Sequence, residues 1–296
     1  MKRVLLLGAT GMLGSAVYSV LKDQYDLVLG VRNPDKIALL DQASGGAGRC
    51  RTIVPFDAAA VYRDYVTKQG ASNAYFAGFL KSAGEVDFVV NAIGVTIPFA
   101  LKDPTQTFFI NGALPHLLAQ RFGEKLIHIT TDCVYNGTNG FPYDEESPKT
   151  PTDTYGLSKS LGEPAGCLTI RTSIIGRELD GCTGLLEWFR RQEGQTITGF
   201  AEHYWNGITT HQFGRICHQI IESPNQFPRR GIYHVFSTPV SKYEMLLAFQ
   251  KKYRVKCTIR PEYEKKLNRS LATCKDLNDK LKTPSFQEML DALPEL

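Results

Sequence analysis

The chain has 296 residues, of which 43% are apolar and 22% charged, a composition typical of a globular protein with a substantial core. Its net charge is only +4, and Lys and Arg are scattered along the chain, so we expect no nucleic-acid partner. No apolar stretch approaches membrane-spanning length and the first residues lack a secretory pattern, so we expect no membrane contact and a cytoplasmic location. Seven cysteines without a C-x-x-C pair and six histidines without a ligand spacing predict reduced thiols and no structural metal.

The chain opens with a short apolar run that breaks into glycines. Residues 4–7 are Val-Leu-Leu-Leu, and Gly8, Gly11 and Gly14 follow at intervals of three before a helical stretch that reaches about residue 22. A glycine turn between a buried strand and a helix lets backbone N–H groups approach a pyrophosphate at the positive end of the helix. We therefore predict dinucleotide binding here. A glycine-rich turn that binds no ligand is the alternative, because the usual pattern spaces its first two glycines more closely.

Short apolar runs then alternate with helical stretches through the first half of the chain. The runs lie at residues 27–31, 52–56, 86–91, 126–130 and 168–171, and helices are expected near 34–40, 58–82, 104–122 and after 153. Alternating strands and helices form βαβ units, whose parallel sheet is buried on both faces. We therefore expect an α/β fold with a doubly wound Rossmann sheet.

The pattern becomes irregular beyond residue 175. Helical patterns cover 181–192, 212–221 and 241–253, strand-like runs cover 232–236 and 257–260, and 199–207 resembles a loop. We expect residues 1–171, with about 208–229 returning to them, to form the dinucleotide-binding Rossmann domain. Residues 172–207 and 230–296 are expected to form a smaller, interleaved C-terminal substrate lobe.

Three polar side chains form a candidate catalytic group. Thr131 directly follows the predicted strand 126–130, and Tyr155 and Lys159 stand four apart, on one face of a predicted helix. A lysine ammonium near a phenol lowers the pKa of the phenol toward the range of a general acid. The Thr131 hydroxyl, at the carboxyl end of a parallel strand, can bind the oxygen that Tyr155 protonates. Singly, a Tyr–Lys surface pair and a strand-end threonine are ordinary features, but their order after a dinucleotide turn favours catalysis.

Several motifs together resemble the extended short-chain dehydrogenases/reductases, and among them the dTDP-4-dehydrorhamnose reductase (RmlD-like) group of sugar-nucleotide reductases. The motifs are Gly8-Ala9-Thr10-Gly11-Met12-Leu13-Gly14, Phe56-Asp57-Ala58, Asn91-Ala92-Ile93-Gly94, Thr130-Thr131-Asp132-Cys133-Val134-Tyr135, Tyr155-Gly156-Leu157-Ser158-Lys159 and Ile170-Arg171-Thr172-Ser173. The resemblance is specific over the first 175 residues and looser beyond them. It implies an NAD(P)-dependent oxidoreductase that reduces a nucleotide-linked 4-keto-6-deoxy sugar for polysaccharide biosynthesis.

The resemblance also implies roles for individual residues. Tyr155 would protonate the ketone oxygen, Thr131 would hold this oxygen, and Lys159 would tune Tyr155 and bind the nicotinamide ribose. Asp57 would contact the adenine amino group. The implied cofactor contacts are Gly8, Thr10, Gly11, Met12, Leu13, Gly14, Asp57, Ala58, Asn91, Ala92, Gly94, Tyr155 and Lys159. A homodimer through the helices that follow the fourth and fifth strands is a further expectation from the family.

The first charge after the second predicted strand indicates the type of cofactor. An acidic residue at this place binds the ribose 2′-hydroxyl of NAD, but here the strand ends in Gly30-Val31-Arg32-Asn33-Pro34-Asp35. Because a guanidinium can bind a 2′-phosphate with two hydrogen bonds, we predict that Arg32 makes NADPH preferred over NADH. A solvent-facing Arg32, with Asp35 nearby, is the alternative.

Two alternatives to a simple reductase stay open. Cys133 stands two residues past Thr131, where related enzymes use a cysteine with a histidine to epimerise the sugar, and His203 is the candidate partner. We favour a buried structural cysteine, since a reactive thiol needs an activating environment. In the second alternative the protein is a non-catalytic, NADP-binding regulatory subunit. The candidate substrate contacts are Val95, Thr96, Asp132, Cys133, Arg177, His203, Trp205 and Arg269.

Overall fold

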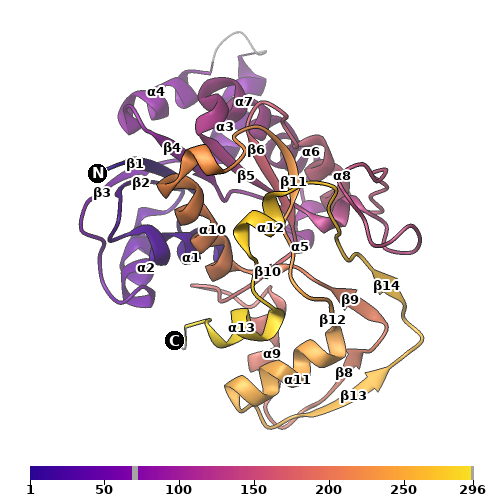
Figure 1. Cartoon of the computed structure of the whole chain (residues 1–296). Coiled ribbons are helices and arrows are strands. Elements are labelled where there is room, and N and C mark those ends of the chain that lie inside the picture. The colour runs from indigo at the N-terminus through magenta and orange to yellow at the C-terminus, as the bar shows by residue number, and fades with distance from the viewer. Residues whose placement is uncertain (69–72, 295–296) are drawn as a thin grey trace.

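One parallel sheet organises the fold of this computed structural model, which describes residues 1–68 and 73–294. The seven strands have the order β11-β6-β5-β4-β1-β2-β3, and every neighbouring pair is parallel. Their bounds are β1 Arg3–Leu7, β2 Asp26–Val31, β3 Arg51–Pro55, β4 Phe88–Asn91, β5 Leu126–Thr131, β6 Leu168–Thr172 and β11 Gly231–His234. The chain winds outward in both directions from β1 and β4, which confirms the doubly wound sheet (Figure 1).

Alternating side chains along β1 show why both faces of the sheet are covered. Val4 and Leu6 are buried in one hydrophobic core, and Leu5 and Leu7 in another. The first core also receives side chains from α1 (Met12–Leu21), α2 (Ile37–Ala43) and α10 (Thr210–Glu222), and α10 lies along α1 in Figure 1. The second core receives side chains from α3 (Ala58–Thr67), α4 (Ala74–Ala83) and α7 (Leu114–Phe122).

The helix expected over 104–122 is divided into three pieces. It consists of α6 (Pro104–Phe108), a π-helical turn η2 (Phe109–Ala113) and α7. Pro115 lies in the first turn of α7 and has no N–H to donate, so the ordinary helical ladder is interrupted before it. The shorter elements of this half are η1 Pro34–Lys36, α5 Ile97–Ala100, η3 Gly123–Lys125, η4 Asp132–Val134 and α8 Thr154–Leu161.

The smaller part of the molecule lies below the sheet in Figure 1 and has its own core. β8 (Thr196–Phe200) pairs with β13 (Thr258–Glu262), and β9 (His203–Trp205) pairs with β12 (Val240–Ser241) and β14 (Leu267–Asn268). α9 (Leu185–Arg190), α11 (Lys242–Tyr253) and α13 (Phe286–Asp291) pack with them. The remaining elements are β7 Ile174–Ile175, β10 Ile208–Thr209, η5 Pro224–Gln226 and α12 Leu277–Leu281.

Two predicted elements of this second half were wrong, and a third is present but belongs to the main sheet. The range 199–207, expected to be a loop, contains the end of β8 and all of β9, because it pairs with strands more than thirty residues away. The helix expected from 181 begins at Leu185, since Gly181 has a φ of +113° and Gly184 is the N-cap. The strand near 232–236 is present as β11, but it pairs with β6 of the main sheet and not with the smaller lobe.

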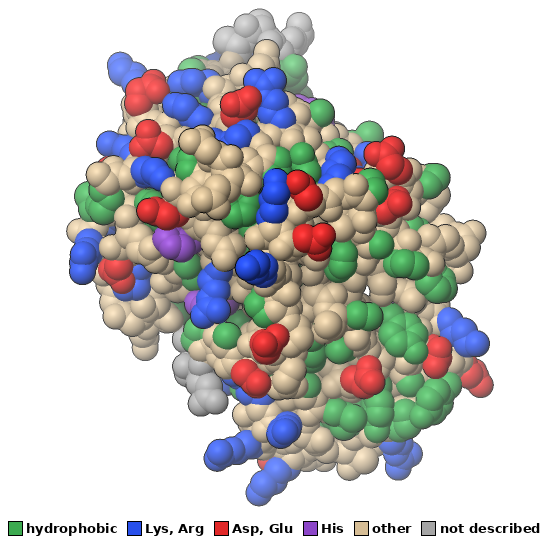
Figure 2. Space-filling view, viewed as in Figure 1, with side chains coloured by type: hydrophobic (Ala, Val, Ile, Leu, Met, Phe, Trp, Pro, Cys, Tyr) green, Lys and Arg blue, Asp and Glu red, His purple; other side chains and the backbone are tan. Residues whose placement is uncertain are grey.

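The charged surface carries no concentrated basic stripe on the face shown in Figure 2, where Lys and Arg side chains are interspersed with Asp and Glu. Within residues 1–68 and 73–294, no helix has the length and hydropathy needed to cross a membrane. The same residues contain no group of three or more His, Cys, Asp or Glu side chains arranged to hold a metal ion.

Candidate active site

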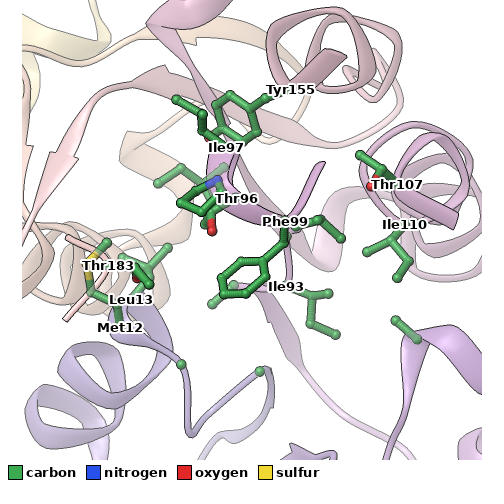
Figure 3. Close-up of a pocket in the computed structure, with 18 of the residues that line it drawn as sticks. Met12, Leu13, Ile93, Thr96, Ile97, Phe99, Thr107, Ile110, Tyr155 and Thr183 are labelled. Carbon is green, nitrogen blue, oxygen red and sulfur yellow. The ribbon is translucent and has the colours of Figure 1, made fainter. Parts of the chain in front are cut away.

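A cleft of about 1250 Å³ lies at the carboxyl ends of the strands, where the strand order reverses between β1 and β4. Ligands of open α/β sheets bind at this position. Residues that follow β1, β2, β3, β4, β5 and β7 line it, together with the first turns of α8. Figure 3 shows Phe99 of α5 projecting into the middle of the cleft, between Tyr155 and the start of α1 at Met12 and Leu13. Sequence reasoning missed Phe99, because one aromatic in the very short helix α5 carries no distinctive pattern.

The glycine turn has the close backbone approaches that a pyrophosphate site requires. Gly8 has a φ of +79°, and a Cβ atom on Gly14 would lie 2.1 Å from the Gly8 carbonyl oxygen. Gly11 is the N-cap of α1 and supplies no side-chain cap, so the first-turn N–H groups of the helix stay available to a ligand. Gly8, Thr10, Gly11, Met12 and Leu13 line the cleft, whereas Gly14 holds the helix against the turn.

The ends of β2 and β3 form the other wall of this half of the cleft. Arg32 lines it, as do Asp57 and Ala58. The Asp57 carboxylate caps α3 by accepting a hydrogen bond from Ala59 N (3.0 Å) and pairs with Arg63 at 3.0 Å. Among the described residues Arg32 has no ion pair, so its guanidinium is available to an anionic ligand in the cleft.

The segment after β4 contributes Ala92, Gly94, Val95 and Thr96 to the cleft. Asn91, expected to contact the cofactor, is instead buried in the sheet. Its side chain is hydrogen-bonded with His128 Nδ1 (3.1 Å) and accepts a hydrogen bond from Ile93 N (3.2 Å). Asn91 therefore supports the backbone of the segment after β4 without lining the cleft.

Asn111 has a similar supporting position that sequence reasoning missed. This buried residue of the π-helical turn accepts a hydrogen bond from Val95 N (2.8 Å) and donates to Val95 O (2.9 Å) and Ser158 Oγ (3.1 Å). It thereby joins the β4 segment to α8. A polar residue within the apolar stretch Phe109-Ile110-Asn111-Gly112 was the available signal, since a buried amide needs partners.

Thr131, Tyr155 and Lys159 all line the cleft. Thr131 ends β5, and its hydroxyl lies close enough to the Tyr155 phenol to act against the rise in the pKa of that phenol. Lys159 is buried, and its Nζ donates to Ile129 O at 2.8 Å, which directs the ammonium across the end of the sheet. Asp153 caps α8 by accepting from Gly156 N at 2.7 Å and so fixes the turn that carries Tyr155.

Burial is the largest cause of the pKa shifts of Lys159 and Tyr155. It lowers the pKa of Lys159 to about 8, while the charge of Glu163 acts in the opposite direction. Burial also raises the pKa of Tyr155, with a further increase from Cys133 and a smaller opposing effect of the Thr131 hydrogen bond. The net pKa of Tyr155 is therefore raised and not lowered as expected, because burial outweighs the effects that favour the phenolate, and Tyr155 stays protonated over the neutral range.

A charged cluster lies beside Thr131 and Tyr155. Thr131 Oγ1 donates to Asp132 Oδ1 at 3.1 Å, and Arg269 donates from Nη1 to Cys133 Sγ at 3.3 Å and from Nε to Tyr135 O at 2.9 Å. Burial raises the pKa of Asp132, although Arg269 opposes this. Burial also raises the pKa of Cys133 to about 12, and Asp132 adds to this effect, so Cys133 is a thiol near pH 7.

Lys242 is a member of this cluster that sequence reasoning missed. It begins α11, directly after the N-cap Ser241, and its Nζ lies 5.7 Å from the centroid of the Trp205 ring. Burial lowers its pKa to about 8, against the opposing charges of Asp132 and Cys133. Burial and the Lys242 charge lower the pKa of His203 to about 4, so His203 is neutral. Lys242 and Arg269 thus place positive charge beside Asp132 and Cys133, which line the cleft.

Four predicted substrate residues do not line the cleft: Arg177, His203, Trp205 and Arg269. Arg177 pairs with Glu187, which holds its guanidinium next to α9. Trp205 is 4% exposed and packs edge-on against Phe286 in the core of the smaller part. Its aromatic surface therefore supports Lys242 and is not available for stacking on a ligand in the cleft.

The chain belongs to the RmlD family, because the family model described as the RmlD substrate binding domain matches residues 1–289. A dTDP-4-dehydrorhamnose reductase of Burkholderia thailandensis is 40% identical over 99 residues, which are 30% of this chain and 33% of that protein. The chain spans about a third of the length of the first curated relatives that it matches.

Longer matches show lower identity. Methionine adenosyltransferase 2 subunit beta of Xenopus tropicalis is 26% identical over 267 residues, which are 83% of this chain and 71% of that protein. The crystal structure of dTDP-4-dehydrorhamnose reductase from Bacillus anthracis in complex with NADP covers 98% of this chain and 97% of that one, with 19% identity and a TM-score of 0.68. This likeness confirms the fold.

Proposed function

We propose that this chain is an NADPH-dependent reductase of a nucleotide-linked 4-keto-6-deoxy sugar, similar to dTDP-4-dehydrorhamnose reductase. The observation that carries the proposal is the presence of Thr131, Tyr155 and Lys159 in the same cleft as the glycine turn. The names of the Burkholderia relative and of the Bacillus anthracis structure with NADP support it. Arg269 and Lys242 place positive charge beside Cys133 and Asp132, which line the cleft, and this suits an anionic sugar nucleotide.

The residues of the cleft fit a dinucleotide. The tight glycine turn and the uncapped start of α1 suit its pyrophosphate, Arg32 suits a 2′-phosphate, and Asp57 lies where an adenine amino group can donate to it. When bound, NADPH supplies the hydride for reduction of a ketone.

The residues of the chain supply the proton and the orientation. Tyr155, protonated because burial raises its pKa, is the general acid for the ketone oxygen. Thr131, whose hydroxyl lies beside this phenol, holds the same oxygen. Lys159 stays in place through its bond to Ile129 O and, charged below a pKa of about 8, stabilises the phenolate that remains after proton transfer.

The test is turnover by purified protein. We expect NADPH to be oxidised in the presence of a nucleotide-linked 4-keto-6-deoxy sugar, with dTDP as the first nucleotide to try. Tyr155→Phe should lower kcat by about 100-fold or more while NADPH binding is retained, since only the acid is removed. Tyr263→Phe is the matched control, because Tyr263 is 61% exposed and does not line the cleft. Full activity of Tyr155→Phe would contradict the proposal.

A bifunctional epimerase/reductase is less well supported. The Cys133 thiol, with a pKa of about 12, is a weak source of the thiolate that would remove a sugar proton. We therefore expect no deuterium exchange at C3 or C5 of a 4-keto sugar in D₂O, and retained reduction by Cys133→Ser. Exchange that disappears in Cys133→Ser would support the epimerase.

The match to methionine adenosyltransferase 2 subunit beta over 83% of this chain favours a second candidate, a regulatory subunit that binds NADP without turnover. The presence of all three catalytic side chains in the cleft argues for the reductase. Absence of turnover on a panel of nucleotide 4-keto sugars, together with tight binding to a methionine adenosyltransferase catalytic subunit, would decide for the regulatory role.

A further inference from the structure

An ion pair joins two distant segments along the rim of the cofactor cleft. Lys36 ends η1, just after β2, and Asp180 follows β7, 144 residues later in the chain. Lys36 Nζ donates to Asp180 Oδ2 at 2.9 Å, and both residues line the cleft. Neither residue was among the sequence candidates, because no local pattern connects them.

The segment 178–184 presents Asp180 from a compact loop. The Glu178 carboxylate accepts hydrogen bonds from Thr183 N (3.2 Å), Thr183 Oγ1 (3.1 Å) and Gly184 N. The Glu178 charge is therefore bound by groups of its own loop. The loop lies over the start of α1, since a Cβ on Gly184 would lie 3.6 Å from Met12 Sδ, and Figure 3 shows Thr183 beside Met12 and Leu13. Asp180 is thus the loop carboxylate that faces the β2 side of the cleft.

The two cations near the end of β2 differ in whether they form an ion pair. Arg32 has no ion pair among the described residues, whereas Lys36 is paired with Asp180, and both side chains line the cleft. Asp57, the other acid in this part of the cleft, is already paired with Arg63. The Lys36 and Asp180 side chains are 38% and 63% exposed, so their ion pair is weak and readily exchanged.

We propose that Lys36 is a second cation for the 2′-phosphate of NADPH, beside Arg32, and that Asp180 competes with the phosphate for it. This inference rests on the dinucleotide binding in the proposed function. A phosphate carries more charge and more acceptor oxygens than one carboxylate, so it displaces Asp180 from Lys36. NADH has no 2′-phosphate and leaves the Lys36–Asp180 pair intact. The pair therefore sets the preference between the two cofactors.

The experiment measures Kd values of NADPH and NADH for the full chain and its variants by calorimetry. Lys36→Gln should weaken NADPH binding about tenfold and change NADH binding less than about twofold. Asp180→Asn should tighten NADPH binding about threefold, because it removes both the competitor and a repulsive charge. Most of this gain should disappear in the double variant, and Lys36→Arg should retain NADPH binding.

Lys68→Gln is the matched control. Lys68 pairs with Asp64 at 2.8 Å, with its side chain 42% exposed, and does not line the cleft. It should change neither Kd, and thermal unfolding of each variant checks its folding. An equal effect of Lys36→Gln on both cofactors, or weaker NADPH binding by Asp180→Asn, would overturn the inference. Failure of the unaltered protein to bind either dinucleotide would instead contradict the proposed function.

Discussion

At the scale of single residues, burial moves the Tyr155 and Lys159 pKa values in opposite directions, and both shifts favour the neutral side chain. For the phenol this means that the proton needed for ketone reduction is present throughout the neutral and mildly basic range. For the ammonium it means that the charge is lost close to physiological pH. Lys159 and not Tyr155 therefore limits the proposed reaction at high pH.

We predict that kcat/KM for ketone reduction falls as pH rises above about 8. The pKa of Lys159 is about 8, so the side chain is charged below this pH and neutral above it. Loss of the ammonium removes the stabilisation of the Tyr155 phenolate formed by proton transfer. A profile of log kcat/KM between pH 6 and 10 measures the effect, because this range brackets the pKa of Lys159.

Lys242 provides the control for this pH dependence, since burial gives it a pKa of about 8 as well. In Lys242→Met the fall above pH 8 should persist at the same midpoint, even where KM for the sugar nucleotide rises. A profile that becomes flat in this variant would assign the titration to Lys242, and the role given to Lys159 would be wrong.

At the scale of elements, two glycines hold α8 against its neighbours. A Cβ on Gly156 would lie 2.2 Å from Cys133 O in η4, and one on Gly162 would lie 1.8 Å from Asn111 O in the π-helical turn. Gly156→Ala must therefore move α8 away from the end of β5. We predict a loss of about 1–3 kcal/mol in the free energy of unfolding from overpacking. We also predict a fall of about tenfold or more in kcat, because Tyr155 and Thr131 are separated.

Gly166→Ala is the control for this substitution. A Cβ there would meet no atom within 4 Å, so both stability and kcat should stay close to those of the unaltered protein. Urea unfolding and the NADPH-oxidation assay measure the two quantities. Unchanged kcat in Gly156→Ala would show that the contact between α8 and η4 does not position the phenol.

Elements with strong local patterns could be predicted from the sequence. The strands around β1 are continuous apolar runs followed by helical patterns, and the capping pair Ser241 and Glu244 marks the start of α11. β9 could not be predicted, because His203-Tyr204-Trp205 becomes a strand only through pairing with β12 and β14. Strand pairing between distant segments depends on the tertiary structure and leaves little trace in a short window.

The candidate site shows the same division. The glycine turn and Thr131, Tyr155 and Lys159 lie within motifs, so their sequence positions alone indicated a shared cleft. Lys242 and the Lys36–Asp180 pair depend on which loops the smaller part of the fold brings to the cleft. Arg177 shows the converse, since its charge suggested a ligand contact and its nearest partner is Glu187.

At the scale of the whole molecule, a buried polar network ties the last strands of the sheet to the loop after β5. Arg171 of β6 donates hydrogen bonds to both carboxylate oxygens of Glu163, at 2.9 and 2.7 Å. It also donates to Tyr135 Oη (2.5 Å) and is hydrogen-bonded with His234 Nε2 of β11 (2.9 Å). Burial alone would raise the pKa of Glu163, but the hydrogen bonds and charge of Arg171 and Lys149 lower it overall. The carboxylate is therefore ionised in the folded protein.

We predict that Glu163→Gln lowers the free energy of unfolding by about 3–5 kcal/mol at pH 7, because the buried Arg171 guanidinium loses its counter-charge. The stabilisation by Glu163 should be complete above the pKa of the unfolded chain and lost as pH falls through the lower folded value. Urea unfolding at pH 7 and at mildly acidic pH measures both effects.

Replacement of both partners separates the ion pair from packing. In Glu163→Met with Arg171→Met neither charge of this ion pair is left buried without the other, so most of the stability lost in Glu163→Gln should return. NADPH binding should be affected less than stability in every variant, since neither residue lines the cleft. A double variant no more stable than Glu163→Gln would mean that Tyr135 and His234, left without the guanidinium, account for the loss. The network would then stabilise the sheet edge through its hydrogen bonds and not through the pairing of charges.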